Sequence, residues 1–210
     1  ILQKHHFKGK IYPINPRVQE IAGLKCYPDI ASLPETPDVA IVMVGTDKAL
    51  TAVKELAELG TPAASVLTSG FSEHGPEGLK KQEALILAAG AMRILGPNTI
   101  GMVNVTDDIP LSPSSALEMD EFPKGGVSVV SQSGGILGSL LSRAAASGLG
   151  LSKLVSTSNE ADLGMADFVN YLTDDPSTKV IVLYLESIRH PEKFRAAALN
   201  AKQAGKPIVV

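Results

Sequence analysis

The sequence predicts a doubly wound α/β fold, in which parallel sheets are covered by crossover helices on both faces. Short apolar runs rich in β-branched residues recur along the chain, and segments with helical period lie between them. Parallel strands need a long connection, which a helix usually provides. With 210 residues, 44% of them hydrophobic and 20% charged, the chain can bury the cores of two modest domains.

The apolar runs predict a series of buried strands, each too short to be a helix. In chain order they lie at 10–14, 39–45, 63–67, 127–131, 153–158, 180–185 and 207–210. A further short strand is expected at 93–95. The clearest helix is expected at 47–59, where Leu50, Val53 and Leu56 line one face and Gly60 stands where a C-terminal cap belongs.

A stretch rich in proline and serine at 107–124 interrupts the periodic pattern and predicts a domain boundary. We expect one α/β domain at 1–112 and a second at 120–210. The first residue is Ile1 rather than methionine, and Val210 falls within an apolar run. We therefore expect the chain to be truncated at both ends.

Composition argues against several classes of function. The net charge of −3, spread over both signs, disfavours nucleic acid or an anionic membrane as a partner and favours a small-molecule substrate. No apolar run approaches the roughly 20 residues needed to cross a bilayer. The single cysteine, Cys26, cannot form an internal disulfide, which fits a reducing cytoplasm. No spaced cluster of histidines, cysteines and acids supports a metal site.

The strongest local motif is the run of small residues that follows the strand at 127–131. Ser133 can cap the helix that begins there, while Gly134 and Gly135 leave its first N–H groups open to an approaching anion. Such a turn suits a phosphate or a carboxylate. A turn needed only for close packing of helix and strand explains the pattern equally well.

The segment 70–78 lies at the carboxyl end of the strand at 63–67, where ligands bind in open α/β sheets. Thr68 and Ser69, which precede it, could donate hydrogen bonds to a ligand. The alternative is a mobile surface loop, in which His74 is a solvated side chain rather than a catalytic group.

Other polar residues also follow predicted strands. Asn98 and Thr99 lie in a turn after residues 93–95 and could face a site, or only form the turn. Asn159 and Asp162 follow the strand at 153–158, where capping of the next helix is the simpler role for Asp162. Glu186 ends an apolar strand and could orient a catalytic group, or be an exposed strand terminus.

In their order along the chain and in their residues, these motifs resemble those of the nucleoside-diphosphate-forming (ADP-forming) acyl-CoA synthetases. The resemblance spans nearly the whole chain, in the segments 8–16, 70–78, 93–101, 131–135, 159–162 and 186–187. It implies a Rossmann-like CoA-binding domain followed by a flavodoxin-like ligase domain, as in the succinyl-CoA synthetase alpha subunit. The family's first strand and glycine-rich loop would lie before Ile1.

The resemblance also implies an acid–thiol ligase. In the family, a carboxylic acid, CoA and ATP give acyl-CoA, ADP and phosphate through an acyl phosphate and a phosphohistidine. By resemblance, the helix start at 133–135 holds that phosphate and Glu186 supports the histidine. The implied CoA contacts are Asn15, Arg17, Leu67, Thr68 and Ser69. The implied residues near the substrate are Asn98, Thr99, Asn159 and Asp162.

Two departures from the family limit what this chain can do alone. In the family, the catalytic histidine lies in a loop that would follow Val210, so the resemblance implies a histidine outside this chain. None of the histidines present lies in such a context; they are His5, His6, His74 and His190. The ATP-grasp domain that would supply ATP and Mg is also missing, so we expect it elsewhere in the polypeptide or on a beta subunit. The chain alone should therefore be inactive, and we expect an oligomer.

Two other functions remain open. Related chains include protein lysine acetyltransferases, in which a similar region without the histidine senses acyl-CoA. A weaker alternative is part of an NAD-binding dehydrogenase, although no G-x-G-x-x-G motif opens a first βαβ unit in this sequence.

Overall fold

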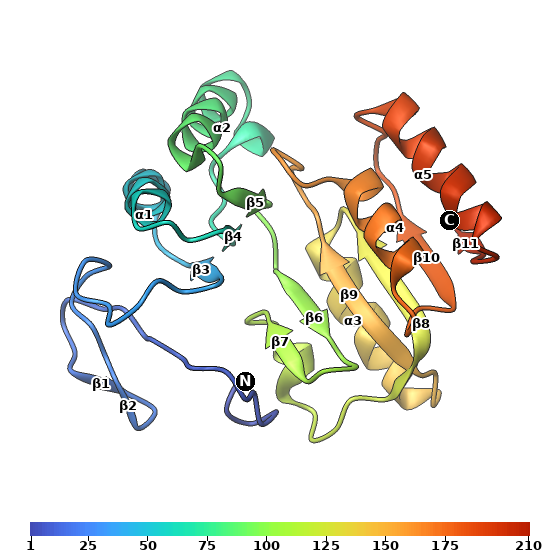
Figure 1. The fold of residues 1–210 in the computed structure, drawn as a ribbon, viewed down its shortest axis with the longest axis horizontal. Helices are drawn as coiled ribbons and strands as arrows, with labels where there is room; N and C mark the ends of the chain where they lie inside the picture. Colours follow the sequence, from blue (N-terminus) through green and yellow to red (C-terminus); the bar gives the residue numbers. More distant parts are fainter.

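The computed structural model describes residues 1–210 and contains two α/β units, which lie side by side in Figure 1. In the first unit, three parallel strands form a sheet in the order β3-β4-β5. Helices α1 and α2 pack against one core with these strands. The bounds are β3 (Ala40–Val42), α1 (Thr46–Glu58), β4 (Ala63–Val66), the 3-10 turn η1 (Ser72–His74), α2 (Pro76–Ala89) and β5 (Arg93–Leu95).

Helix α1 has the predicted face and the predicted end. Val53 and Leu56 are buried, and burying one such side chain stabilises the fold by about 1.5–3 kcal/mol. The helix ends at Glu58, and Gly60 follows with a φ of +88°, a left-handed backbone that glycine adopts without strain. The helix expected at 47–59 is therefore confirmed to within one residue at each end.

Residues 10–14 form no strand, so this expectation is wrong. Only Ile14 makes an isolated bridge, to Tyr27, and the short antiparallel pair β1 (Glu20–Ile21) and β2 (Leu24–Lys25) lies between them in the chain. A strand requires a backbone partner along its length. Residues 10–14 instead line an apolar hollow of about 450 Å³ together with residues of β3.

The second unit holds a six-stranded sheet in the order β11-β10-β8-β9-β6-β7. Strands β11, β10, β8 and β9 are parallel, as the sequence predicts. The bounds are β6 (Met102–Asn104), β7 (Ile109–Leu111), the 3-10 turn η2 (Ser115–Glu118), β8 (Lys124–Ser131), α3 (Gly134–Ala146), β9 (Leu151–Ser156), α4 (Met165–Asp174), β10 (Val180–Tyr184), α5 (Pro191–Gln203) and β11 (Ile208–Val209).

Helices cover both faces of this second sheet, and alternate residues of β8 show why. Val129 packs into a core that includes Leu137 of α3, whereas Val130 packs into a separate core with Val169 of α4 and Ala197 of α5. Successive side chains of a strand point to opposite faces, so α3 lies on one face and α4 and α5 on the other (Figure 1). The predicted doubly wound architecture is confirmed here.

An antiparallel hairpin, β6–β7, joins the two units and was not predicted. β6 pairs with both β7 and β9 in the antiparallel direction, so the second sheet is mixed. Pro110 lies in β7, at the edge of the sheet, where its missing N–H is tolerated. The hairpin falls within the range 1–112 that the sequence assigns to the first domain, although its strands pair with the second sheet.

A buried polar cluster fixes the amino edge of the parallel strands; we call Lys153, Asp175, Ser177 and Thr178 the amino-edge cluster. Lys153 Nζ lies 2.8 Å from Asp175 Oδ2 and 2.7 Å from Ser177 Oγ, with the Lys153 and Asp175 side chains only 4% and 9% exposed. Burial opposes ionisation of Asp175, but hydrogen bonds from Lys153, Thr178 and Ser177 outweigh it and hold the pKa of that carboxyl far below its usual range.

None of the helices combines the length and the apolar character that a membrane span requires.

Candidate functional site

The candidate site lies along the carboxyl edges of the two sheets, where the loops after β4 and β5 meet. The backbone N–H of Asn98 donates to the carbonyl oxygen of Thr68 at 2.9 Å. The Thr68 hydroxyl donates to the carbonyl oxygen of Val44 at 2.6 Å, so it is already engaged with the end of the first sheet. The structure therefore brings Thr68, a predicted CoA contact, next to Asn98, a predicted substrate contact.

The neighbours of Thr68 are held in the same way. The N–H of Leu67 donates to the carbonyl oxygen of Val42 at 3.0 Å, which continues the pairing of β4 with β3. The carbonyl oxygen of Ser69 accepts from the Thr46 hydroxyl at 2.9 Å. The Ser69 hydroxyl itself is exposed and has no hydrogen-bond partner in the protein.

Thr99 has a structural role in the turn after β5. It is 3% exposed, and its hydroxyl donates to the carbonyl oxygen of Ser156 at 2.5 Å while accepting from the N–H of Gly101 at 2.8 Å. Asn98 is partly buried with a φ of +63°, and its amide lies 3.5 Å from that of Asn159. Of the two predicted residues, Asn98 is the one whose side chain is less fully engaged.

The start of α3 lies against this turn. A Cβ atom added at Gly134 would lie 2.8 Å from Ile100 Cγ2, closer than packed carbon atoms approach, so glycine permits the contact. Ser133 occupies the N-cap position, but its side chain makes no capping bond, so this part of the expectation is wrong. Ser131 Oγ instead accepts from the N–H of Ser133 at 3.1 Å.

The first N–H groups of α3 have no partner within the helix, as at every helix start. Beside them runs an open groove of about 740 Å³, lined mainly by small side chains of α3 and of the segment 114–116. Gly134 and Gly135 border it, and Arg143 adds the positive charge of its side chain two turns further along α3. The groove is large enough for part of an anionic ligand.

Glu186 comes from the loop after β10 and is exposed, and its carboxylate makes no hydrogen bond or ion pair in the structure. Its backbone is held by Gln132, the residue between β8 and Ser133. Gln132 Oε1 accepts from the N–H groups of Glu186 and Ser187 at 2.7 and 2.9 Å. The structure therefore brings Glu186 near the start of α3 through a residue that the sequence reasoning missed.

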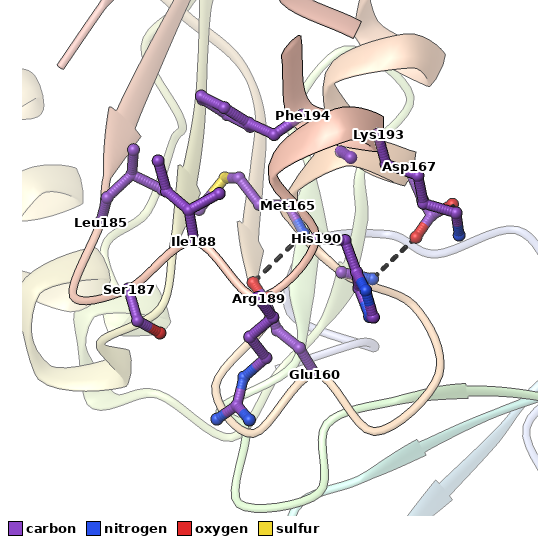
Figure 2. A pocket seen from close by; sticks show the side chains of 12 residues that line it. Glu160, Met165, Asp167, Leu185, Ser187, Ile188, Arg189, His190, Lys193 and Phe194 are labelled. Atoms are coloured by element: carbon purple, nitrogen blue, oxygen red, sulfur yellow. Dashed lines mark hydrogen bonds and ion pairs between the residues drawn. The ribbon is translucent and has the colours of Figure 1, made fainter. Parts of the chain in front are cut away.

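Gln132, Thr157 and Glu160 form a second buried network, which we call the carboxyl-edge cluster. Glu160 Oε1 accepts from Gln132 Nε2 at 3.1 Å, from the Thr157 hydroxyl at 2.8 Å and from the N–H of Met165 at 3.1 Å. The last of these bonds is drawn in Figure 2. One carboxylate thus ties together the loops after β8 and β9 and the start of α4.

Asn159 joins the two units. It is buried, and its side-chain amide donates to Glu73 Oε2 at 2.5 Å and to Gln82 Oε1 at 3.0 Å, both from the first unit. Burial acts to raise the pKa of Glu73, but the hydrogen bonds from Asn159 and from the backbone at residues 70–71 outweigh it and lower that pKa. Glu73 is therefore an exposed residue whose carboxylate is held at the interface by hydrogen bonds.

Asp162 also joins the units and does not cap α4. Its carboxylate accepts two bonds from the Arg93 guanidinium, at 2.9 and 3.0 Å, and one from the N–H of Ile94 at 2.8 Å. At the start of α4, Asp167 Oδ2 accepts from the N–H of Gly164 at 3.0 Å instead. The capping interpretation of Asp162 is therefore wrong, and its role in the structure is a bidentate ion pair.

Asn15 and Arg17 lie at a turn before β1. Asn15 Oδ1 accepts from the N–H of Arg17 at 2.9 Å, and the N–H of Asn15 donates to the carbonyl oxygen of Tyr27 at 2.8 Å. The Arg17 side chain is exposed and makes no ion pair. No hydrogen bond joins these residues to the loop 67–69.

Figure 2 shows a small pocket between the start of α4 and the loop after β10. The sulfur of Met165 points toward Leu185 and Ile188, while the Arg189 guanidinium points away from this apolar group. The cavity measures about 20 Å³, room for about one water molecule. It is too small for a substrate in this conformation, so the groove beside α3 is the better candidate.

The histidines make contacts that do not indicate catalysis. His5 stacks on Phe122 and its Nε2 lies 2.7 Å from the carbonyl oxygen of Leu117. His74 lies in η1, and His190 is an exposed residue at the start of α5. No group of three or more histidines, cysteines and acids is placed to hold a metal ion.

Family models match both units of the fold. A CoA binding domain matches residues 1–105, and a succinyl-CoA ligase like flavodoxin domain matches residues 124–210. The chain belongs to the CoA-binding domain family. The flavodoxin-like domain follows it in the order that the motif resemblance implies, so the predicted domain types and their order are confirmed.

Curated relatives confirm the resemblance to the ADP-forming acyl-CoA synthetases. A trans-feruloyl-CoA synthase from an unknown prokaryotic organism is 42% identical over 100% of this chain and 30% of its own length. An ADP-forming acetate–CoA ligase from Methanocaldococcus jannaschii is 37% identical over 97% of this chain and 28% of its own. The alpha subunit of an ADP-forming acetate–CoA ligase from Pyrococcus furiosus is 32% identical over 98% and 44%. The chain thus spans less than half the length of each of these relatives.

Among solved structures, an acetyl-coenzyme A synthetase from Ca. Korarchaeum cryptofilum matches with a TM-score of 0.92 and 34% identity, over 100% of this chain and 45% of the other. An ATP citrate lyase from Methanothrix soehngenii, at 20% identity and a TM-score of 0.69, shares the fold.

Proposed function

We propose that the chain is the CoA-binding and ligase core of an ADP-forming acyl-CoA synthetase, an acid–thiol ligase. The reaction joins a small carboxylic acid and CoA, with ATP converted to ADP and phosphate, by way of an acyl phosphate and a phosphohistidine. The N-terminal end of α3 holds the phosphate at Ser133, Gly134 and Gly135, and Glu186 supports the histidine.

One observation supports the proposal most directly: the turn of Asn98 and the backbone of Glu186 both lie beside the start of α3. Ile100, in the turn of Asn98, packs against Gly134, and Gln132 holds the backbone of Glu186 beside the same helix start. Free N–H groups at a helix start are preorganised donors for phosphate oxygens, which is the main requirement for transferring a phosphoryl group. The family membership and the named activities of the relatives support the same assignment.

CoA binds the first unit in this proposal. Asn15, Arg17, Leu67, Thr68 and Ser69 are its proposed contacts. The exposed Arg17 guanidinium suits a phosphate of CoA, because it can donate paired hydrogen bonds. Four residues lie near the substrate in this proposal. Asn98 faces it, whereas Thr99 fixes the turn, and the interface is fixed by Asn159 and Asp162.

The remaining parts of the reaction come from elsewhere in this proposal. An ATP-grasp domain, fused or on a beta subunit, binds ATP with Mg and phosphorylates a histidine that none of the four in this chain supplies. A relative named as an alpha subunit supports a partner of this kind. The complete protein is an oligomer in the cytoplasm, and the 210-residue chain alone does not turn over.

The test is phosphorylation of the full-length gene product, together with any ATP-grasp partner, by labelled ATP. We expect acid-labile, base-stable phosphate on the protein, discharged by ADP or by a carboxylic acid with CoA. Absence of label with acyl-CoA binding retained would replace the ligase by the sensing module of a lysine acetyltransferase.

The phosphate site is tested by Gly134→Leu in the same complete protein. A side chain at this position meets Ile100 and covers the helix start, so labelling should be abolished. Ala146→Leu is the matched control, because it adds the same side chain to an exposed position of α3 that does not line the groove. Unchanged labelling of the Gly134 variant would remove the assignment of phosphate to α3.

A further inference from the structure

Gln132 is a buried, uncharged residue at the carboxyl end of β8. It is 7% exposed, and its backbone N–H donates to the carbonyl oxygen of Tyr184 at 3.1 Å, which extends the pairing of β8 with β10 by one residue. Its side chain then points along the carboxyl edge of the sheet toward the loop that follows β10.

The side-chain amide of Gln132 uses its full hydrogen-bonding capacity. Oε1 accepts from the N–H groups of Glu186 and Ser187, while Nε2 donates to the carbonyl oxygen of Ser187 at 2.9 Å and to Glu160 Oε1 at 3.1 Å. A primary amide has two donor hydrogens and two acceptor lone pairs, so all four are satisfied. The amide acts as a substitute peptide group where the backbone ladder between β8 and β10 has ended.

The loop that carries Glu186 makes few other polar contacts. The residues from Glu186 to His190 are all exposed, and no side chain of this segment makes a hydrogen bond or an ion pair. The Glu186 carboxylate is therefore positioned through its backbone, and that backbone is fixed by Gln132.

We propose that Gln132 is a positioning residue for phosphoryl transfer, which holds Glu186 at a fixed place relative to the N-terminal end of α3. Gln132 directly precedes Ser133, so one residue connects the proposed phosphate site with the proposed partner of the histidine. Glu160 completes the arrangement, because it receives the remaining donor hydrogen of the amide and also the N–H of Met165, at the start of α4. The inference rests on the proposed function.

The experiment is a double-mutant cycle in the complete protein, with the rate of phosphoenzyme formation from labelled ATP as the readout. Gln132→Met keeps the length of the side chain but removes the amide. We expect the rate to fall about tenfold to a hundredfold, since a misplacement of about 1 Å has effects of that size, with the dissociation constant of CoA unchanged within twofold. Glu186→Gln should slow the reaction similarly, and the double variant should be no slower than the slower single variant.

A control separates positioning from stability. Thr178→Val removes a buried hydroxyl at the opposite end of the same sheet, where it bonds to Ser128 at 2.8 Å. This variant should lose thermal stability without losing rate. If Gln132→Met does not fold, Gln132→Asn takes its place in the cycle, because it keeps an amide but shortens the side chain by one methylene, so the amide is drawn back from the N–H groups of Glu186 and Ser187.

Two results would overturn the inference. One is an unchanged rate in the Gln132 variants, and the other is multiplication of the two single effects in the double variant, which would mean that Gln132 acts independently of Glu186. Labelling of the unsubstituted protein would still support the proposed function in either case, so the two failures are distinguishable.

Discussion

The two ends of the parallel strands β8, β9 and β10 each carry a buried polar network, but the networks are built for different purposes. The amino-edge cluster is a charged pair, Lys153 and Asp175, closed by hydroxyl groups at the base of the sheet. The carboxyl-edge cluster centres on one neutral amide and one carboxylate, and most of its bonds go to the backbone of loops. The first therefore fixes the sheet itself, and the second fixes the loops that a ligand would meet.

The difference teaches that burial and charge alone do not identify a functional site. The amino-edge cluster has the stronger electrostatics, with the pKa of Asp175 far below its usual range, yet it lies at the edge where open α/β sheets do not bind ligands. The carboxyl-edge cluster contains only one ionisable side chain, but it lies next to the start of α3. We therefore predict the effects of changing the buried amino-edge pair and, by comparison, the charged groups that lie near the carboxyl-edge cluster.

The largest effect is expected from Asp175→Ala. This change leaves the Lys153 ammonium buried without its partner, which costs about 3–5 kcal/mol of stability. Native-state hydrogen exchange of β9 amides in the complete protein measures the loss, and Asp174→Ala, at the exposed neighbouring position, is the control. A loss equal to that of the control would show that the buried pair does not stabilise the amino edge.

The pH dependence of acid unfolding should also distinguish the amino-edge cluster from the interface between the two units. A folded pKa below the unfolded value of about 3.9 means that Asp175 adds stability at higher pH and that this contribution disappears as the pH falls below about 4. Asp175→Asn should therefore flatten the pH dependence of acid unfolding, by up to about 1.4 kcal/mol per pH unit. Glu73→Gln at the interface should flatten it less, because Glu73 is more exposed. Equal slopes in the protein and the Asp175 variant would contradict the assignment.

A smaller effect is expected where the two units meet beside the carboxyl-edge cluster. Arg93→Lys replaces a two-bond contact with Asp162 by a single point charge, and because the Arg93 side chain is 53% exposed the loss should be about 0.5–1 kcal/mol. Hydrogen exchange of β5 amides in the complete protein reports it. A loss above about 2 kcal/mol would mean that this pair, rather than Asn159, carries the interface.

The smallest effect is expected from Lys193→Ala. The Lys193 ammonium lies 3.9 Å from Asp167 Oδ1, and its side chain is 66% exposed. Exposed pairs of this kind contribute about 0–1 kcal/mol, so the exchange rates at the start of α4 should change little. A change comparable to that of Asp175→Ala would erase the distinction between surface and buried pairs.

The sequence predicted what depends on local pattern. The strand β8 and the start of α3 were predicted because an apolar run passes directly into small residues. The helix α1 was predicted because its apolar residues repeat at helical spacing. Residues 10–14 have an equally apolar pattern, but their only backbone partner is Tyr27, and pattern alone does not supply a neighbouring strand. The hairpin β6–β7 depends on pairing with β9, about fifty residues later, and carries Pro110 as a misleading sign of a loop.

The site was predictable only in part for a similar reason. Glu186 and Gly134 stand at strand ends in the sequence, where a search for polar or small residues finds them. Gln132 carries no charge and belongs to no spacing rule, and its importance comes from the loop it meets more than fifty residues later. For Asp162, the distant Arg93 outweighed the local capping preference, since a bidentate ion pair is stronger than one cap.

The pairing of β6 with β9 determines where this chain can be divided. A fragment beginning at residue 124, where the flavodoxin-like match starts, would lack β6 and leave one edge of β9 with unpaired N–H and carbonyl groups. Open edges of this kind recruit strands from other molecules and cause aggregation. A fragment that begins at Gly101 keeps the hairpin, covers that edge, and is the shorter piece to purify when the second unit is studied alone.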